Sequence, residues 1–191
     1  MLDINRHKLT LVQILKDIYS DIEIASLLGF KGGTAVYLFY NLPRFSVDLD
    51  FNLLNVDRKE TVFKKIELIL KKYGELKEKR EKRFTLFFLV SYSEKAQNVK
   101  IEISKNDFPD TYEIKNYLGI PMLVMKSDDM FAHKLVALLE RKLIANRDIF
   151  DVWFFMKNKW NINKNLIKLR TKMDCKQYLG KCIEALEKLD N

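Results

Sequence analysis

Hydrophobic residues recur along the first half of the chain at spacings of either a helix or a strand. Apolar positions three and four residues apart indicate helices, whereas short apolar runs and alternating apolar and polar positions indicate strands. The pattern predicts helices at about 8–19, 21–28 and 58–72, and strands near Phe30 and at 47–53, 84–91 and 99–104. Gly74 is placed to end the third of these helices.

Helical spacing dominates the second half of the chain. Pro109 and the Gly119–Pro121 turn mark the passage into it, followed by a short strand at 122–125 in which Val124 is expected to be the last sheet residue. Helices are predicted at 128–143, 147–157, 164–170 and 175–189. We therefore expect an α+β protein, with a small mixed β-sheet flanked by helices in residues 1–121. A mainly helical subdomain, residues 122–191, is expected to pack on this core.

Two groups of apolar residues in the second half are expected to form core. The last helix carries one apolar stripe, which comprises Tyr178, Leu179, Cys182, Ile183, Leu186 and Leu189. Intramolecular packing is the simpler interpretation of this stripe, and a docking face for a partner protein is the alternative. The aromatic residues Trp153, Phe154, Phe155 and Trp160 are expected to lie in the core between the helical half and the sheet.

Composition favours a folded cytoplasmic protein. The chain has 191 residues, of which 48% are hydrophobic, enough for a sizeable core. Its longest apolar runs are far shorter than the roughly 20 residues that span a bilayer, and the N-terminus has no apolar secretory segment. Cys175 and Cys182 would lie about 10 Å apart on one helix, too far for a disulfide, so we expect reduced thiols.

The formal net charge of +8 favours a polyanionic partner, of which RNA is the obvious candidate. Much of the excess lies in Lys64-Lys65, Lys71-Lys72 and the mixed segment 77–83. A solvated helix face and hairpin would give the same pattern, because aromatic residues are not clearly interleaved with these cations.

Two alternating carboxylates are the first chemical signal. In the predicted strand at 47–53, Asp48 and Asp50 project from one face, while Val47, Leu49 and Phe51 point to the core. Two carboxylates at one place repel each other unless a cation joins them, and Mg²⁺ bound together with substrate phosphates suits such oxygen ligands. The pair therefore predicts phosphoryl or nucleotidyl chemistry.

A glycine turn precedes these carboxylates. Gly32 and Gly33 allow the backbone N–H groups to approach phosphate oxygens, and Thr34 is expected to cap a helix at about 35–40. A hydroxyl at Thr34 or Ser46 would add a further contact. Either motif alone is typical of an ordinary strand, turn and helix with solvated aspartates, but their order and spacing together favour a nucleotide site.

The segment FKGGTAVYLFYNLPRFSVDLDF resembles the signature of the nucleotidyltransferase-like AbiEii/AbiGii toxin family, of the DNA polymerase β-like superfamily. The matching positions are Gly32, Gly33, Arg44, Ser46, Asp48 and Asp50. The resemblance implies a nucleotidyltransferase fold and a third metal-binding carboxylate on a later strand. Glu102 in the 99–104 strand is the candidate, and a solvent-facing glutamate on an edge strand is the alternative.

A second block, residues 126–135 and 146–153, resembles the same family. The resemblance implies that Lys134 and Arg147 bind the triphosphate, and that Asp148 or Asp151 binds substrate or acts as a general base. Structural alternatives remain for each. Lys134 lies beside an apolar stripe, and Arg147 and Asp151 have the spacing of an ordinary i,i+4 ion pair, with Asp148 projecting elsewhere.

Other residues of this block have structural interpretations. Ser127 is expected to cap the helix at 128–143, with Asp128 and Asp129 in its first turn. His7 and His133 are the only histidines, so a zinc site or a histidine-dependent triad is not expected. His133 is expected to be a packing or surface residue.

The resemblance implies a metal-dependent enzyme. Mg²⁺ or Mn²⁺, held by Asp48, Asp50 and Glu102, would support transfer of a nucleotidyl group from an NTP to tRNA, another RNA or a protein. A toxin of a toxin–antitoxin or abortive-infection system would also have a cognate antitoxin. A metal-dependent nuclease is disfavoured by the glycine turn. A non-catalytic nucleotide- or RNA-binding module on the same fold is the main alternative.

Overall fold

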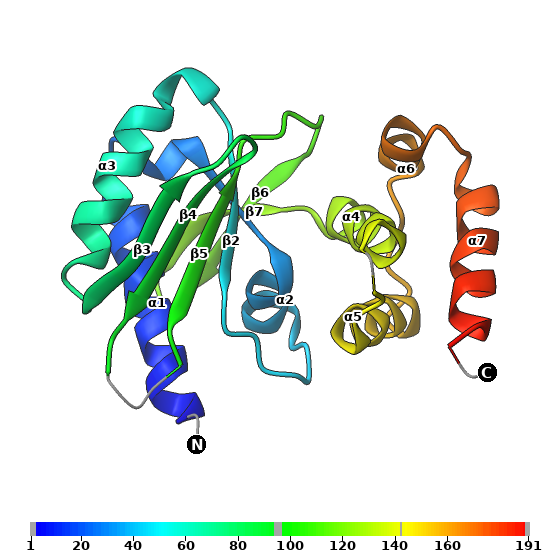
Figure 1. Ribbon diagram of the computed structural model, residues 1–191, viewed down its shortest axis with the longest axis horizontal. Helices are drawn as coiled ribbons and strands as arrows, with labels where there is room; N and C mark the ends of the chain where they lie inside the picture. The colour runs from blue at the N-terminus through cyan, green and yellow to red at the C-terminus, as the bar shows by residue number, and fades with distance from the viewer. Residues whose placement is uncertain (1–2, 94–96, 142, 190–191) are drawn as a thin grey trace. The chain divides into compact units, whose positions relative to one another are not determined.

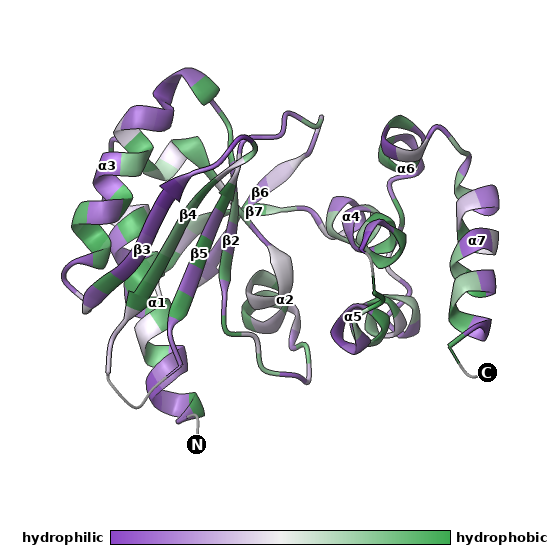
Figure 2. Cartoon of the chain, in the orientation of Figure 1, coloured by the Kyte–Doolittle hydropathy of each residue, from purple (hydrophilic) through white to green (hydrophobic). Residues whose placement is uncertain are grey.

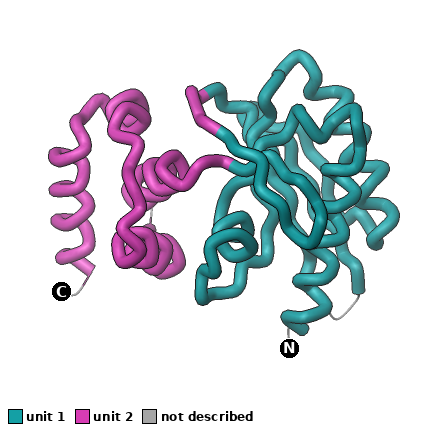
Figure 3. The backbone as a smooth tube through the Cα atoms, turned by 180° about the vertical axis from the view of Figure 1, so that it is seen from behind, with its two compact units in different colours: residues 1–107, 112–124 teal, residues 108–111, 125–191 magenta. Residues whose placement is uncertain are grey.

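The chain forms two compact units in the computed structural model (Figure 3), residues 1–107 with 112–124 and residues 108–111 with 125–191. The structure describes residues 3–93, 97–141 and 143–189. None of the described helices is long and apolar enough to cross a membrane.

Helices are interspersed with strands up to α3, five consecutive strands follow, and after residue 125 the described elements are all helices (Figure 1). The α-helices are α1 Ile4–Ser20, α2 Gly32–Tyr40, α3 Lys59–Leu70, α4 Ser127–Glu140, α5 Asn146–Lys157, α6 Lys164–Thr171 and α7 Cys175–Glu187. The strands are β1 Leu28–Lys31, β2 Leu49–Leu53, β3 Glu75–Glu81, β4 Thr85–Ser91, β5 Val99–Ser104, β6 Tyr112–Tyr117 and β7 Ile120–Met125. Short 3₁₀ helices occupy Ala25–Leu27 and Val56–Arg58.

One seven-stranded sheet organises the first unit, in the order β3-β4-β5-β2-β1-β7-β6. The β2/β5 and β1/β7 pairs are parallel, whereas β1/β2, β3/β4 and β4/β5 are antiparallel. The predicted mixed sheet flanked by helices is therefore confirmed. Phe30 of β1 pairs with Val124 of β7, and that strand runs one residue past the predicted end.

The two faces of the β4–β5–β2 part of the sheet differ in burial. Helices α1 and α3 cover one face (Figure 1). Alternate strand residues on this face are fully buried, among them Leu49, Phe51, Leu86, Phe88, Ile101 and Ile103. The residues between them on β4 and β5 are only half-buried, so we call this second side the open face.

Strands β3 and β6 were not predicted. Strand β3 is hydrophilic along its length, whereas its neighbour β4 is mostly hydrophobic (Figure 2). Because β3 is an edge strand exposed on both sides, it lacks the apolar alternation that indicates a strand. β6 is the other edge strand and has no buried residue.

Several predicted boundaries also need correction. The helix predicted near 21–28 is a 3₁₀ helix at Ala25–Leu27, and Leu28 already belongs to β1. Strand β2 begins at Leu49, so Val47 and Asp48 precede it, and Val47 is half-buried rather than core. Ser127 is the first residue of α4 and not its cap, because Lys126 takes the N-cap position.

The core of the second unit is formed by its own helices. Phe131 of α4 and Phe155 of α5 are 1% exposed and their ring centroids lie 5.3 Å apart. Trp160 stacks on Phe155 at 4.3 Å, with ring planes 8° apart. Trp153 was predicted to be core, but it is 49% exposed because it lies on the opposite side of α5 from Phe155.

The apolar stripe of α7 is only partly buried. Tyr178 and Cys182 are 5% and 4% exposed, and the Tyr178 hydroxyl donates to the Val136 carbonyl of α4. Ile183 and Leu189 are 57% and 54% exposed, so the prediction that the whole stripe packs internally was wrong for them. Both cysteines have free thiols.

Candidate active site

The predicted carboxylates lie where β2 and β5 run side by side. Asp50 of β2 is in register with Glu102 of parallel β5 and with Lys31 of antiparallel β1. Residues in register on neighbouring strands point to the same side of a sheet. Asp50 and Glu102 therefore both point to the open face. Asp48 lies in the segment that directly precedes β2.

A lysine joins two of these carboxylates. The Lys100 Nζ atom lies 3.2 Å from Asp48 Oδ2 and 3.1 Å from Glu102 Oε2. Burial lowers the pKa of the Lys100 ammonium, but Asp48 and Glu102 together raise it above its ordinary value. Lys100 therefore stays charged and balances part of the negative charge. This contact was not predicted from the sequence.

The surroundings of Asp50 raise the pKa of its carboxyl group. Burial raises the pKa of Asp50, Lys100 and Lys31 oppose that shift, and repulsion from Asp48 and Glu102 adds to it. A carboxylate that two other carboxylates repel is expected to bind a further cation readily. The electrostatics thus agree with the predicted role of Asp50, which stays a prediction.

The glycine turn contacts Asp50 directly. Gly32 begins α2 with φ of +80°, and a Cβ atom at this residue would collide with the Asp50 carboxylate. A side chain is therefore disfavoured at Gly32 by both its backbone conformation and its surroundings. The backbone at the start of α2 and the carboxylate of β2 meet at this point.

Thr34 has a different role from the one predicted. It lies inside α2 and is fully buried, and its hydroxyl donates to the Asp48 carbonyl instead of capping the helix. This bond fixes the segment before β2 against α2. The N-cap position of α2 is held by Lys31, whose side chain makes no capping bond, so the first N–H groups of the helix remain available to an anion.

Arg44 and Ser46 reach the same turn. A Cβ atom placed on Gly33 would lie 2.8 Å from Ser46 Oγ and 3.0 Å from Arg44 Nη2, so both polar ends lie beside the Gly33 backbone. The structure thus brings together seven of the predicted residues of the first motif, namely Gly32, Gly33, Thr34, Arg44, Ser46, Asp48 and Asp50, with Glu102 beside them.

The second motif forms its own cluster in the second unit. Lys134 Nζ lies 2.9 Å from Asp148 Oδ1 and 3.0 Å from Asp151 Oδ2, and both aspartate side chains are fully buried. Arg141 Nε lies 3.1 Å from Asp148 Oδ2. Asp148 was predicted to project away from Asp151, and this prediction was wrong. Both side chains contact Lys134, because residues three apart on α5 share a face.

Arg147 is not part of this cluster. Its side chain is exposed, and among the described residues no ion pair joins it to Asp151, whose carboxylate faces Lys134 instead. The predicted i,i+4 pair is thus replaced by a contact between α5 and α4. The predicted nucleotide-binding role of Arg147 stays a prediction.

The two histidines have structural partners. His133 Nε2 lies 2.6 Å from Asp110 Oδ1, and its Nδ1 atom lies 2.7 Å from Arg170 Nη1. Since a guanidinium only donates, Nδ1 accepts and Nε2 carries the proton. His7 is fully buried, with its ring nitrogens 2.8 Å from the Tyr92 hydroxyl and 3.1 Å from the Val47 carbonyl. Both are packing residues, as expected for His133.

The carboxylates supply hard oxygen ligands, as Mg²⁺ and Mn²⁺ prefer. Among the described residues, no three histidine, cysteine, aspartate or glutamate side chains lie close enough together to hold a metal ion. The Lys100 ammonium lies between two of the predicted metal ligands, Asp48 and Glu102. The predicted metal-binding role of Asp48 and Asp50 stays a prediction.

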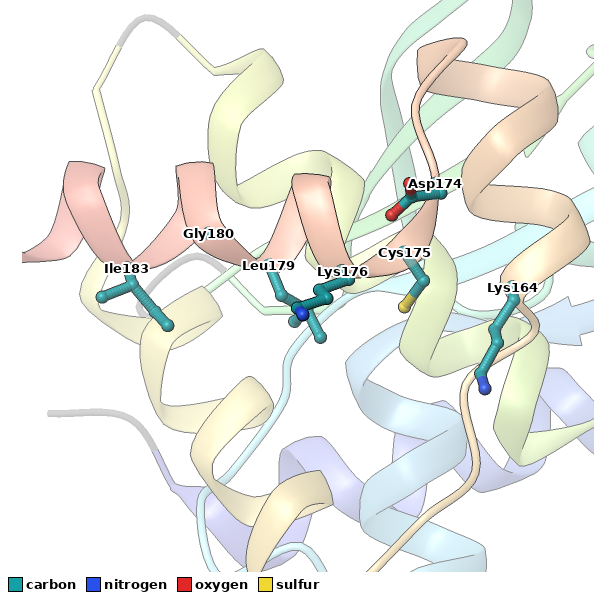
Figure 4. A pocket seen from close by; sticks show the side chains of 7 residues that line it. All are labelled: Lys164, Asp174, Cys175, Lys176, Leu179, Gly180 and Ile183. Atoms are coloured by element: carbon teal, nitrogen blue, oxygen red, sulfur yellow. The ribbon is translucent and has the colours of Figure 1, made fainter.

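A groove of about 630 Å³ lies along α7 in the second unit (Figure 4). It is lined by Lys164, Asp174, Cys175, Lys176, Leu179, Gly180 and Ile183. None of the predicted site residues lines this groove.

Comparisons with known proteins gave a matching family model and similar solved structures. A family model described as nucleotidyl transferase AbiEii toxin, Type IV TA system, matches residues 13–190. The crystal structure of JHP933 from Helicobacter pylori is similar at 26% identity with a TM-score of 0.61, covering 82% of this chain and 68% of that one. A search of curated proteins gave no match.

Two structures of the antibiotic-resistance factor ANT(2″)-Ia share the fold. The solution structure is 11% identical with a TM-score of 0.59 and covers 97% of each chain. The crystal structure in complex with adenylyl-2″-tobramycin is 13% identical with a TM-score of 0.53, covering 81% of this chain and 90% of that one. At these identities the likeness concerns the fold alone.

Proposed function

The chain belongs to the AbiEii nucleotidyltransferase toxin family, and we propose that it transfers a nucleotidyl group from an NTP to a hydroxyl group of tRNA, another RNA or a protein. The observation that carries this proposal is the contact between Gly32 and Asp50. It places a helix start that suits phosphate next to a carboxylate that suits a metal ion, as a nucleotidyltransferase requires.

The metal ion would be Mg²⁺ or Mn²⁺, held by Asp48 and Asp50, with Glu102 as a third ligand. When bound, it would neutralise the triphosphate and acidify the attacking hydroxyl. Glu102 Oε2 lies 3.1 Å from Lys100 Nζ, so metal binding by this carboxylate would compete with that ion pair. Lys100 would then be free to contact an anionic group of the substrate.

The start of α2 would bind the phosphates of the NTP. The N–H groups of Gly32, Gly33 and Thr34 lie in the first turn of this helix, where the helix dipole favours an anion. Arg44 and Ser46 end beside Gly33 and would add a cation and a hydroxyl. The Thr34 hydroxyl is engaged with Asp48, so Thr34 would contribute through its backbone only.

Lys134 and Arg147 of the second unit would supply cations to the triphosphate. Asp148 and Asp151 hold the Lys134 ammonium at 2.9 and 3.0 Å, which restricts its orientation. One of these two aspartates would act on the substrate or as a general base.

The toxin class implies growth arrest through modification of an essential cytoplasmic acceptor and neutralisation by a cognate antitoxin. A non-catalytic nucleotide- or RNA-binding module is the second candidate. The Lys100 contacts favour this candidate, because an internal ammonium between Asp48 and Glu102 occupies the charge environment that an enzyme would offer to a metal ion.

Incubation with each labelled NTP in turn, Mg²⁺ or Mn²⁺, total tRNA and cell lysate would separate the two candidates. We expect label in RNA or protein with the parent and none with Asp48→Ala/Asp50→Ala. Glu60→Gln, which removes an exposed carboxylate of α3, is the matched control and should retain transfer. Metal-dependent NTP binding without transfer by the parent would favour the binding module.

A further inference from the structure

A row of side chains leads from the candidate site across the open face to the edge of the sheet. Asp50 is in register with Glu102, Glu102 with Phe87 of β4, and Phe87 with Arg80 of β3. Because neighbouring strands lie about 4.8 Å apart, this row is about 14 Å long. It begins at the carboxylates and ends at Arg80 on β3, an edge strand that carries charges of both signs.

Cations and aromatic rings are paired at the far end of this row. Lys82 Nζ lies 4.0 Å from the centroid of the half-buried Phe87 ring. The Arg83 guanidinium lies 4.9 Å from the centroid of Phe84, which is 54% exposed. These pairs of cations and rings were not predicted from the sequence, although their residues lie within six positions of one another.

Some cations of this hairpin form ion pairs with carboxylates and others do not. Lys77, Lys79 and Arg80 each form an ion pair, with Glu75, Glu67 and Glu78 respectively. Within the described ranges, no carboxylate pairs with Lys82 or Arg83, whose recorded partners are the two phenylalanine rings. These two cations are thus the ones most able to contact an external anion.

We infer that Arg80, Lys82, Arg83, Phe84 and Phe87, here called the β3–β4 strip, bind a single-stranded nucleic acid and direct its end toward Asp50. Direction toward Asp50 rests on the proposed transferase function, whereas binding to the strip does not. Base stacking on an aromatic ring with phosphate contacts from neighbouring cations is the usual chemistry of such surfaces. The exposed ring of Phe84 and the half-buried ring of Phe87, each beside a cation that has no carboxylate partner within the described ranges, fit this ligand better than a protein acceptor.

The experiment measures binding of a fluorescein-labelled single-stranded RNA of mixed sequence by anisotropy, without NTP or metal, over a range of salt concentrations. Lys82→Gln/Arg83→Gln should weaken binding about 10-fold and reduce the slope of log K against log salt by about 1.4, since each lost phosphate contact accounts for about 0.7. Phe84→Ala should weaken binding about 10-fold with little change in this slope.

The matched control is Lys64→Gln/Lys71→Gln, which removes the same charge from exposed positions of α3 and its C-cap. Circular dichroism establishes that each variant is folded. Equal losses in the control and in Lys82→Gln/Arg83→Gln would overturn the inference, because binding would then follow net charge. Absence of binding by the parent would overturn it as well.

A transfer assay separates this inference from the proposed function. In one outcome, the parent binds RNA but transfers nothing, and the strip variants do not bind RNA. This result would support RNA binding by the strip and contradict the transferase proposal. Transfer to RNA that is unaffected in all strip variants would support the transferase and contradict the strip. Transfer by the parent to a protein only would contradict the strip as an acceptor path.

Discussion

Removing the Lys134 ammonium is expected to destabilise the second unit strongly. Lys134 lies within ion-pair distance of Asp148 and Asp151, whose side chains are fully buried. The substitution Lys134→Met keeps most of the aliphatic stem and removes the charge. Two buried carboxylates then lose the cation that they share.

The magnitude follows from this burial. Removing one partner of a buried ion pair costs about 3–5 kcal/mol, because the remaining charge lacks compensation in a medium of low polarity. Arg141 still contacts Asp148, but its side chain is 42% exposed, so solvent screens this contact. We therefore expect a loss near the lower end, about 3 kcal/mol, a large part of the 5–15 kcal/mol typical of a domain.

Urea denaturation followed by tryptophan fluorescence measures this loss selectively. Both tryptophans, Trp153 and Trp160, lie in the second unit, and Trp160 stacks on the buried Phe155. The fluorescence transition therefore reports the free energy of unfolding of that unit. Arg147→Met is the control, because it removes an exposed cation from the same helix as the aspartates, and it should change stability by less than about 0.5 kcal/mol.

Equal shifts of the transition in Lys134→Met and Arg147→Met would refute the reasoning. A double variant gives a second test. Adding Asp148→Asn to Lys134→Met removes one of the uncompensated charges, so it should recover part of the lost stability. The loss of unfolding free energy caused by Asp148→Asn is compared in the parent and in Lys134→Met. If the loss is the same in both, the two residues are not coupled.

Three further predictions follow from single positions. Gly32→Ala should lower the stability of the first unit by about 2 kcal/mol, measured by circular dichroism in urea, because φ is +80° and the new Cβ atom would collide with the Asp50 carboxylate; an unchanged midpoint would contradict this. Gly180→Ala should stabilise the second unit by about 1 kcal/mol by tryptophan fluorescence, since this helical residue has open space around its Cβ position; a loss would contradict it. Burial raises the pKa of Cys182 from 9.0 to about 11, so the unfolded thiol ionises first and unfolding becomes easier as pH rises from 9 to 11. The fluorescence midpoint of Cys182→Ala should therefore fall less over this range than that of the parent, and parallel curves would exclude the effect.

Much of the fold could be predicted from the hydrophobic pattern. Strands β2, β4 and β5 and helices α3 to α7 have clear periodicity because each buries one face or stripe. Strand β3 could not be predicted in this way. It lies at an edge with no buried residue, so its residues Glu75–Glu81 reflect solvent exposure on both sides.

The first motif of the site was predictable because its residues are close in sequence. Asp48 and Asp50 follow the glycine turn by fewer than twenty residues, and short turns restrict where they can lie. The position of Lys100 was not predictable, because it depends on the register between β2 and β5, which the sequence between them does not specify. Lys134 and Asp148 likewise meet only through helix packing.

The parallel pairing of β2 with β5 has a consequence for the order in which the protein forms during synthesis. Asp50 can pair with Glu102 only after β5 has been synthesised, roughly fifty residues later. The parallel pairing of β1 likewise requires Val124 of β7, which is synthesised later still. Pairings between distant segments form late and slow the folding of a domain. The carboxylate pair is therefore incomplete on a nascent chain, and a premature stop before β5 leaves a fragment that lacks Glu102 and both central parallel partners.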